Sequence, residues 1–231
     1  MDIKKFSVAL AALAFSATTA NASIIQVTPA SIGTSYTVNY DGFADGNTID
    51  GLSGQTTFTL TGATDKSYTF NYSVSNTSGD PIDASRISIF GFNTDPTISS
   101  ASSTGLFDQT ATGNVPSGFG SVDICFKGSG GPNCSGGGGE GVQMGDSASG
   151  SLTLNFSDAL TQLTLSDFFV RYQSIEGAGA PGSAIGRGTV GGSTGGSTGG
   201  STGGTPVPAP GALALFVIGA AGLAARRRRH A

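Results

Sequence analysis

The sequence predicts an all-β protein, namely a β-sandwich domain with jelly-roll-like connectivity over residues 23–188. Two observations carry this prediction. Apolar and polar residues alternate with a period of two in several short runs, and no stretch of ten residues in this region shows a helical period. Gly, Pro, Asn and Asp clusters separate the runs at fairly regular spacing, as is typical of sandwiches. About 165 residues suffice for one domain with its own core.

The clearest strand is Lys66–Asn76, in which Tyr68, Phe70, Tyr72 and Val74 alternate with polar residues. Gln55–Thr61 has the same pattern, and the intervening turn residues predict a hairpin over Gln55–Asn76. The other predicted strands are Ser35–Asp41, Ser85–Asn93, Ser121–Phe126, Ser149–Asp158 and Leu160–Ile175. We expect a β-bulge at Gly91, a bend near Ser166–Asp167, and a loop-rich middle over Ala101–Gly150.

The first 22 residues have the pattern of a secretory signal peptide. Lys4 and Lys5 form a basic start, an apolar stretch follows over Phe6–Ala17, and Ala20-Asn21-Ala22 fits a cleavage site. We therefore expect export by the Sec machinery and cleavage by signal peptidase after Ala22, which would leave Ser23 as the new N-terminus.

Residues 189–204 read as a flexible linker. They contain a four-residue Gly-Gly-Ser-Thr repeat, which has no apolar side chains to bury. As a flexible coil this segment would span about 20 Å. We expect it to tether the domain at a distance from the segment that follows it.

The last predicted unit, residues 205–231, has three parts in order. A Pro-rich turn is followed by an uncharged run over Gly211–Ala225, which as a transmembrane helix would be about 22 Å long. A basic end follows, made of Arg226, Arg227, Arg228 and Arg229. Basic residues favour the cytoplasmic side, so the rest of the chain would lie across the membrane. An ordinary tail anchor that is never cut is the alternative interpretation.

These three parts resemble the PEP-CTERM sorting signal of Gram-negative bacteria. Its motif stands here as Val207, Pro208, Ala209 and Pro210, where the family usually has Glu at the position of Ala209. The resemblance covers about 25 residues at the C-terminal end. It implies an exosortase-type membrane protease that removes the tail, and a surface or extracellular polysaccharide setting.

Cys125 and Cys134 are the chain's two cysteines, and both lie in the part expected to be exported. Thiols oxidise in that setting, so we predict a disulfide that closes a Gly-rich loop. The cysteines and their flanks, together with Phe169–Ser174, are similar to a subgroup of PEP-CTERM proteins called the cistern family. That resemblance implies no known activity.

Charge and residue types limit the chemistry. Of 11 Lys and Arg, two precede Ser23 and four follow Gly204, which leaves five; of 15 Asp and Glu, only Asp2 lies outside, which leaves 14. The exported segment is therefore near −9 and should repel nucleic acid and anionic lipid. The single histidine is His230, so a histidine-activated nucleophile is excluded from the domain.

We accordingly expect no enzyme, no catalytic residues and no cofactor. The chain should be an exported, non-enzymatic protein that passes the inner membrane transiently and ends at the cell surface or in the extracellular matrix. The alternatives are a permanently tail-anchored periplasmic protein and a glycan-binding module, in which calcium could assist. The candidate calcium ligands are Asp41, Asp45, Asn47 and Asp50.

Overall fold

A computed structural model describes residues 23–136, 138–177, 179 and 181–194. The predicted signal peptide with Ala20 and Ala22, the sorting motif Val207–Pro210, the apolar run and the arginines Arg226–Arg229 lie outside the described residues. Within the described ranges no helix is long and apolar enough to cross a membrane.

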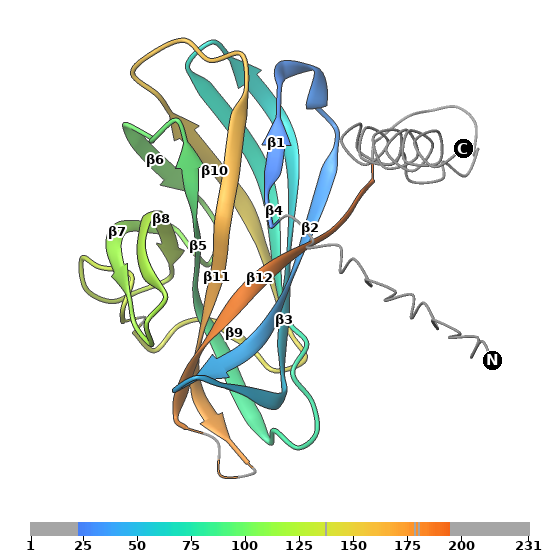
Figure 1. Ribbon diagram of the computed structural model, residues 1–231, viewed down its shortest axis with the longest axis vertical. Helices are drawn as coiled ribbons and strands as arrows, with labels where there is room; N and C mark the ends of the chain where they lie inside the picture. Colours follow the sequence, from blue (N-terminus) through green and yellow to red (C-terminus); the bar gives the residue numbers. More distant parts are fainter. Residues whose placement is uncertain (1–22, 137, 178, 180, 195–231) are drawn as a thin grey trace, which may run out of the picture. The chain divides into compact units, whose positions relative to one another are not determined.

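The described residues fold into strands joined by turns, with one turn of 3-10 helix, η1, at Pro29–Ser31 (Figure 1). The strands are β1 (Ile25–Val27), β2 (Ser35–Ala44), β3 (Asn47–Thr64), β4 (Ser67–Asn76), β5 (Ala84–Asp95), β6 (Ser100–Ser103), β7 (Gln109–Val115), β8 (Gly120–Lys127), β9 (Val142–Gln143), β10 (Ser147–Asn155), β11 (Leu163–Glu176) and β12 (Ser183–Thr194).

All strands belong to one antiparallel sheet with the order β6-β10-β4-β3-β2-β12-β11-β5-β8-β7, while β1 pairs with β11 and β9 with β5. The end strands β6 and β7 contact each other, so the sheet nearly closes on itself. The all-β, sandwich-like prediction is confirmed. The order does not show the Greek keys of a jelly roll. In a Greek key the strand after a three-strand meander returns beside the first strand, but after the meander β2-β3-β4 the next strand, β5, lies between β11 and β8, and β2 has β12 as its other neighbour.

The structure corrects two boundaries. The middle region contains β6, β7, β8 and β9 and the start of β10, because Ser, Thr and Gly positions there pair through their backbones even though few are apolar. Strand β12 extends to Thr194, into the predicted linker. Its small residues pair with β2, with Val190 opposite Val38 and Ser193 opposite Tyr36, and such backbone pairing does not require bulky side chains.

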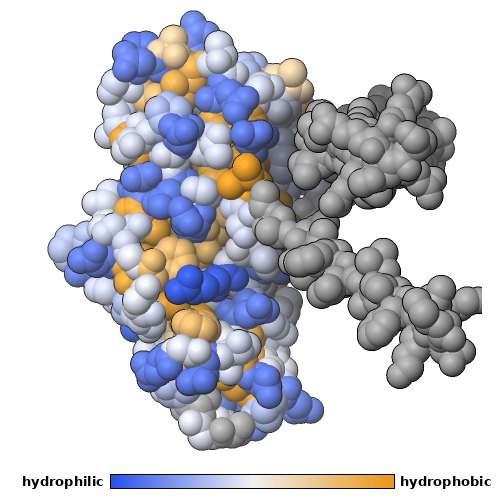
Figure 2. Space-filling model, in the orientation of Figure 1, coloured by the Kyte–Doolittle hydropathy of each residue, from blue (hydrophilic) through white to orange (hydrophobic). Residues whose placement is uncertain are grey.

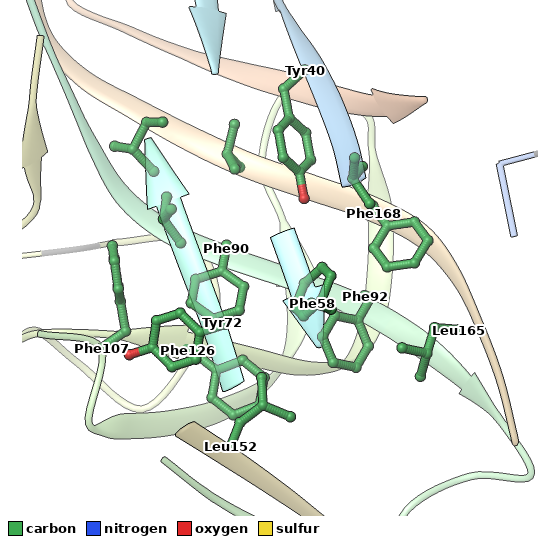
Figure 3. Packing of buried hydrophobic residues seen from close by; sticks show 14 of the residues in the cluster. Tyr40, Phe58, Tyr72, Phe90, Phe92, Phe107, Phe126, Leu152, Leu165 and Phe168 are labelled. Carbon is green, nitrogen blue, oxygen red and sulfur yellow. The ribbon is translucent and has the colours of Figure 1, made fainter. Parts of the chain in front are cut away.

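The core lies between the two halves of the folded sheet and is rich in aromatic residues (Figure 3). Phe58 of β3 stands at its centre. Its ring centroid lies 5.7 to 6.5 Å from those of Phe70, Phe90, Phe92 and Phe168, which come from β4, β5 and β11. Such pairs each stabilise a fold by about 0.5–1.5 kcal/mol beyond the area they bury. The strand alternation read from the sequence thus places the predicted inward residues correctly.

A second, smaller cluster lies on the opposite face of β5 and β11. Its members are Ile89, Ala111, Val115, Val122, Cys125, Cys134, Phe169 and Ile185. The β7–β8 hairpin and the disulfide loop supply five of these eight residues, so these two segments cover that face of the sheet. Elsewhere, on the face that Figure 2 shows, apolar residues surface as small areas between polar ones.

Gly91 has a role that differs from the predicted bulge. It is paired in register with both Phe169 and Cys125. A Cβ at this position would lie 2.5 Å from the carbonyl oxygen of Ile124 and 2.5 Å from the ring of Phe169. Glycine is therefore required at this position, because any side chain would collide with β8 and with the ring of Phe169 on β11.

Candidate functional site

The bend predicted at Ser166–Asp167 is a β-bulge in β11. Ser166 is opposite Asn93 of β5, but the next pair joins Phe169 to Gly91, so β11 has one extra residue at this point. Asp167 has φ of 50°, the left-handed region that Asn and Asp tolerate better than most residues. The bulge allows Phe168 to point into the main core while Asp167 remains exposed.

Hydrogen bonds hold the Asp167 side chain in place. The amide nitrogen of Asn93 donates to its Oδ2 at 3.0 Å, and the hydroxyl of Ser166 donates to the same atom at 3.2 Å. Asn93 is itself oriented by Asp123 of β8, whose backbone N–H donates to the Asn93 Oδ1 at 2.9 Å. The Asp123 carboxylate in turn accepts from the backbone N–H of Thr94 at 2.8 Å.

The tip of the β7–β8 hairpin folds over this part of the sheet. Ser117, Gly118 and Gly120 all have positive φ, which allows the tight turn around Phe119. The ring of Phe119 packs on Phe169 of β11, with 5.3 Å between their centroids. The hairpin tip is therefore anchored to the sheet by an aromatic contact.

Arg187 of β12 joins the hairpin tip to β2. Its guanidinium carbon lies 5.4 Å from the ring centroid of Phe119 and 5.1 Å from that of Phe43. Each cation–π contact at an exposed position contributes about 0.5–1 kcal/mol. Because the flat group lies against two rings, its N–H edges are the part left for a ligand.

These groups surround a hollow of about 390 Å³, which we call the bulge hollow. It is lined by Ser23, Asn93, Phe119, Ser121, Asp167, Phe168, Arg187 and Gly188. The volume lies at the lower end of the range for small-ligand sites. Carboxylate and amide acceptors stand beside guanidinium and amide donors, and no histidine or free thiol is among the lining residues. The hollow is suited to hydrogen-bonding a polar ligand.

A larger hollow of about 680 Å³ lies between β6 and the β7–β8 pair. Its walls are Ser, Thr, Ala and Gly residues together with Ile98, Val122, Ile124 and Pro132, and Asp123 is the single charged lining residue. It offers few side chains that could fix the orientation of a ligand, and we therefore favour the bulge hollow.

The candidate calcium ligands do not converge. Asp45 and Gly46, with φ of 49° and 85°, form the turn of the β2–β3 hairpin, and the Asn47 amide donates to the Asp45 carbonyl at 3.1 Å. Asp41 and Asp50 lie further along β2 and β3. In the part of the chain that the structure describes, no three His, Cys, Asp or Glu side chains form a group that could hold a metal ion.

The predicted disulfide is present. Cys125 of β8 and Cys134 are bonded, with 5.9 Å between their Cα atoms, and both are fully buried in the second cluster. Next to them is Lys127, which is 1% exposed and donates from Nζ to the carbonyl of Asn133 at 3.0 Å. Burial lowers the pKa of Lys127. Its role in holding the disulfide loop was not foreseen, since an isolated lysine in a sequence favours an exposed position.

Sequence reasoning found some parts of the bulge hollow and missed others. The bend at Ser166–Asp167, which places Asp167 at the hollow, was predicted. Asn93, Phe119 and Arg187 carry no local motif. They come from β5, the β7–β8 turn and β12, and only their packing brings them together.

No family model, no curated protein and no solved structure matches the chain.

Proposed function

We propose that the chain is an exported, non-enzymatic protein of the cell surface or extracellular matrix. The observation that supports this most directly is the buried Cys125–Cys134 disulfide, since such bonds form and persist in oxidising compartments. The signal-peptide pattern of residues 1–22 supports the same route. Inner-membrane passage is transient in this proposal.

The C-terminal part of the proposal is a PEP-CTERM-like sorting signal, with the cistern subgroup as its finer form. In it the apolar run Gly211–Ala225 spans the membrane as a helix, the four arginines stay in the cytoplasm, and an exosortase-type protease cuts near Val207–Pro210. Residues 195–204 then link the domain to the signal, because β12 takes up the preceding six residues.

Intact-mass measurement of surface-extracted protein tests the route. We expect a chain that begins at Ser23 and has lost Arg226–Arg229. A mass that includes the four arginines would favour the permanently tail-anchored periplasmic alternative, and a mass that includes residues 1–22 would contradict export by signal peptidase.

A second function, glycan binding, is favoured by the bulge hollow. Saccharides present adjacent hydroxyl groups, each of which can donate and accept, and Asp167, Asn93 and Arg187 offer acceptors and donors around one small volume. Phe119 adds an apolar wall. The proposed extracellular polysaccharide setting would supply such ligands.

Binding of the mature chain to a glycan array, with and without a chelator, tests this second function. We expect Asp167→Asn and Phe119→Ala to weaken the glycan signals and Asp158→Asn, in an exposed turn outside the hollow, to leave them unchanged. Signals that are equal in all three variants would place glycan binding elsewhere. Loss of signal in chelator would support the calcium-assisted form.

A further inference from the structure

We infer that the α-amino group which signal-peptide cleavage creates on Ser23 becomes part of the bulge hollow, so that the glycan site is complete only in the mature chain and prefers a saccharide that carries a carboxylate. This inference rests on the proposed export and glycan binding. It names the state of the protein that binds and the class of sugar that fits.

The position of Ser23 follows from the pairing of β1 with β11. Ile25 is opposite Leu165 and Gln26 is opposite Thr164, in antiparallel register. Continuing this register by two residues brings Ser23 opposite Asp167, at the bulge. Ser23 and Asp167 both line the bulge hollow, which agrees with that register. Residues directly opposite in antiparallel strands have Cα atoms about 4.5–5.5 Å apart.

Cleavage changes the charge that lines the hollow. In the precursor the backbone nitrogen of Ser23 is a neutral amide, and the charged lining groups are Arg187 and Asp167, with a sum of zero. A free α-amino group has a pKa of about 7.7–8.0 and is protonated below it. The mature hollow therefore has two cations and one carboxylate, and a net charge of +1.

This arrangement matches a sugar acid better than a neutral sugar. The ligand carboxylate can accept charge-assisted hydrogen bonds from the Arg187 edge and the Ser23 ammonium, while ring hydroxyls donate to Asp167. Asp167 keeps acceptor sites free, because Asn93 and Ser166 both bond to Oδ2. Other carboxylates nearby are Asp41, opposite Arg187 on β2, and Asp123, behind Asn93. Neither carboxylate lines the hollow, so the charges of Arg187, Asp167 and the Ser23 amine decide the preference for an acidic over a neutral sugar.

Calorimetric titration with a matched pair of oligosaccharides, oligogalacturonate and its uncharged galactose counterpart, tests the inference. At pH 6.5 we expect the mature chain beginning at Ser23 to bind the acidic sugar about tenfold more tightly than the neutral one. A chain beginning at Ala22 keeps its terminal charge but moves it by about 3.3 Å, and we expect it to lose this preference. Arg187→Gln should lose it too.

The pH dependence has a definite sign. The preference of the mature chain for the acidic sugar should fall as pH rises through the amine pKa, since the ammonium loses its proton there. An equal preference in the chains that begin at Ser23 and Ala22, or a preference unchanged at pH 9.5, would overturn the inference while leaving glycan binding intact.

A ligand-free measurement separates failure of the inference from failure of glycan binding. If neither sugar binds, glycan binding at the hollow fails, and titration of the Ser23 amine by NMR still decides whether it lies beside Asp167. The nearby carboxylate should raise the amine pKa, so Asp167→Asn should lower it and Asp158→Asn should not. An amine pKa that is the same in all three chains would overturn the placement of Ser23.

Discussion

Replacement of Asn76 by alanine should destabilise the protein more than its place at the end of a strand would indicate. Asn76 is 1% exposed and lies at the end of β4. Its amide nitrogen donates to Ser85 Oγ at 3.0 Å, to the Ser85 carbonyl at 3.2 Å and to the Val142 carbonyl at 3.3 Å. Its Oδ1 accepts from the Ser78 hydroxyl at 2.8 Å and the Ser78 backbone N–H at 3.2 Å. One side chain thus connects β4 to β5, to β9 and to the loop after β4.

The magnitude follows from the groups that would lose their partners. Among the described residues, Asn76 is the only hydrogen-bond partner of the Ser78 N–H and of the Ser85 hydroxyl. The Ser85 carbonyl would keep a partner, because it also accepts from the Met144 N–H. A buried polar group left unpaired costs about 1–3 kcal/mol. Two such groups predict a loss of about 2–6 kcal/mol in the free energy of unfolding, a large part of the 5–15 kcal/mol typical of a domain.

The assay is urea unfolding followed by far-UV circular dichroism, because the chain has no tryptophan for fluorescence. Asn71→Ala is the matched control, since Asn71 lies on the same strand with its side chain exposed, and it should change the free energy by no more than about 0.5 kcal/mol. A loss below about 1 kcal/mol for Asn76→Ala, with cooperative unfolding, would show that the Ser78 N–H and the Ser85 hydroxyl find other partners without Asn76.

Three further predictions concern the disulfide, the packing and the buried tyrosines. Replacing both Cys125 and Cys134 by alanine should lower the free energy of unfolding by about 2.5–3 kcal/mol, because the disulfide restricts the entropy of the unfolded chain. Reduction of the wild-type disulfide should give a similar loss of stability in thermal melts. Equal melting temperatures with and without reductant would contradict this. Gly91→Ala should lower the free energy of unfolding by about 2–4 kcal/mol, because the new Cβ would meet Ile124, Phe169 and Cys125. Gly62→Ala is the control and should be close to neutral, since the nearest atom lies 3.8 Å from the new Cβ. Similar urea midpoints for the two variants would show that β5 can shift. Burial raises the pKa of Tyr40 and of Tyr172 in the folded protein. Both phenols therefore keep their protons in the folded protein but ionise near pH 10 in the unfolded chain. Their effect on the free energy of unfolding is constant below pH 10. Above pH 10 the free energy of unfolding falls by up to about 1.4 kcal/mol per pH unit for each tyrosine. Urea midpoints at pH 8 and pH 11 should show this fall, Tyr172→Phe should reduce it, and equal midpoints at both pH values would disprove it.

The fold class and most of the core residues could be predicted from the sequence alone. Strand alternation is a local property, because successive side chains of a strand point to opposite faces whatever the strand pairs with. Tyr68, Phe70, Tyr72 and Val74 could therefore be assigned to the inner face before any partner strand was known, and all four are buried. The disulfide was equally predictable, since the domain has two cysteines and a short loop between them.

The strand order, the extent of β12 and the bulge hollow depend on contacts between distant segments and could not be predicted. Pairing depends on backbone groups that every residue has, so residues 191–194, the first unit of a Gly-Gly-Ser-Thr repeat that reads as a linker, belong to β12 and pair with β2. Asn76 is the last residue of a predicted strand, and only the approach of β5 and β9 makes it a buried junction. Asn93, Phe119, Asp167 and Arg187 lie far apart along the chain, and Ser23 joins them because β1 pairs with β11. Such sites depend on contacts between distant segments, which no local pattern in the sequence records.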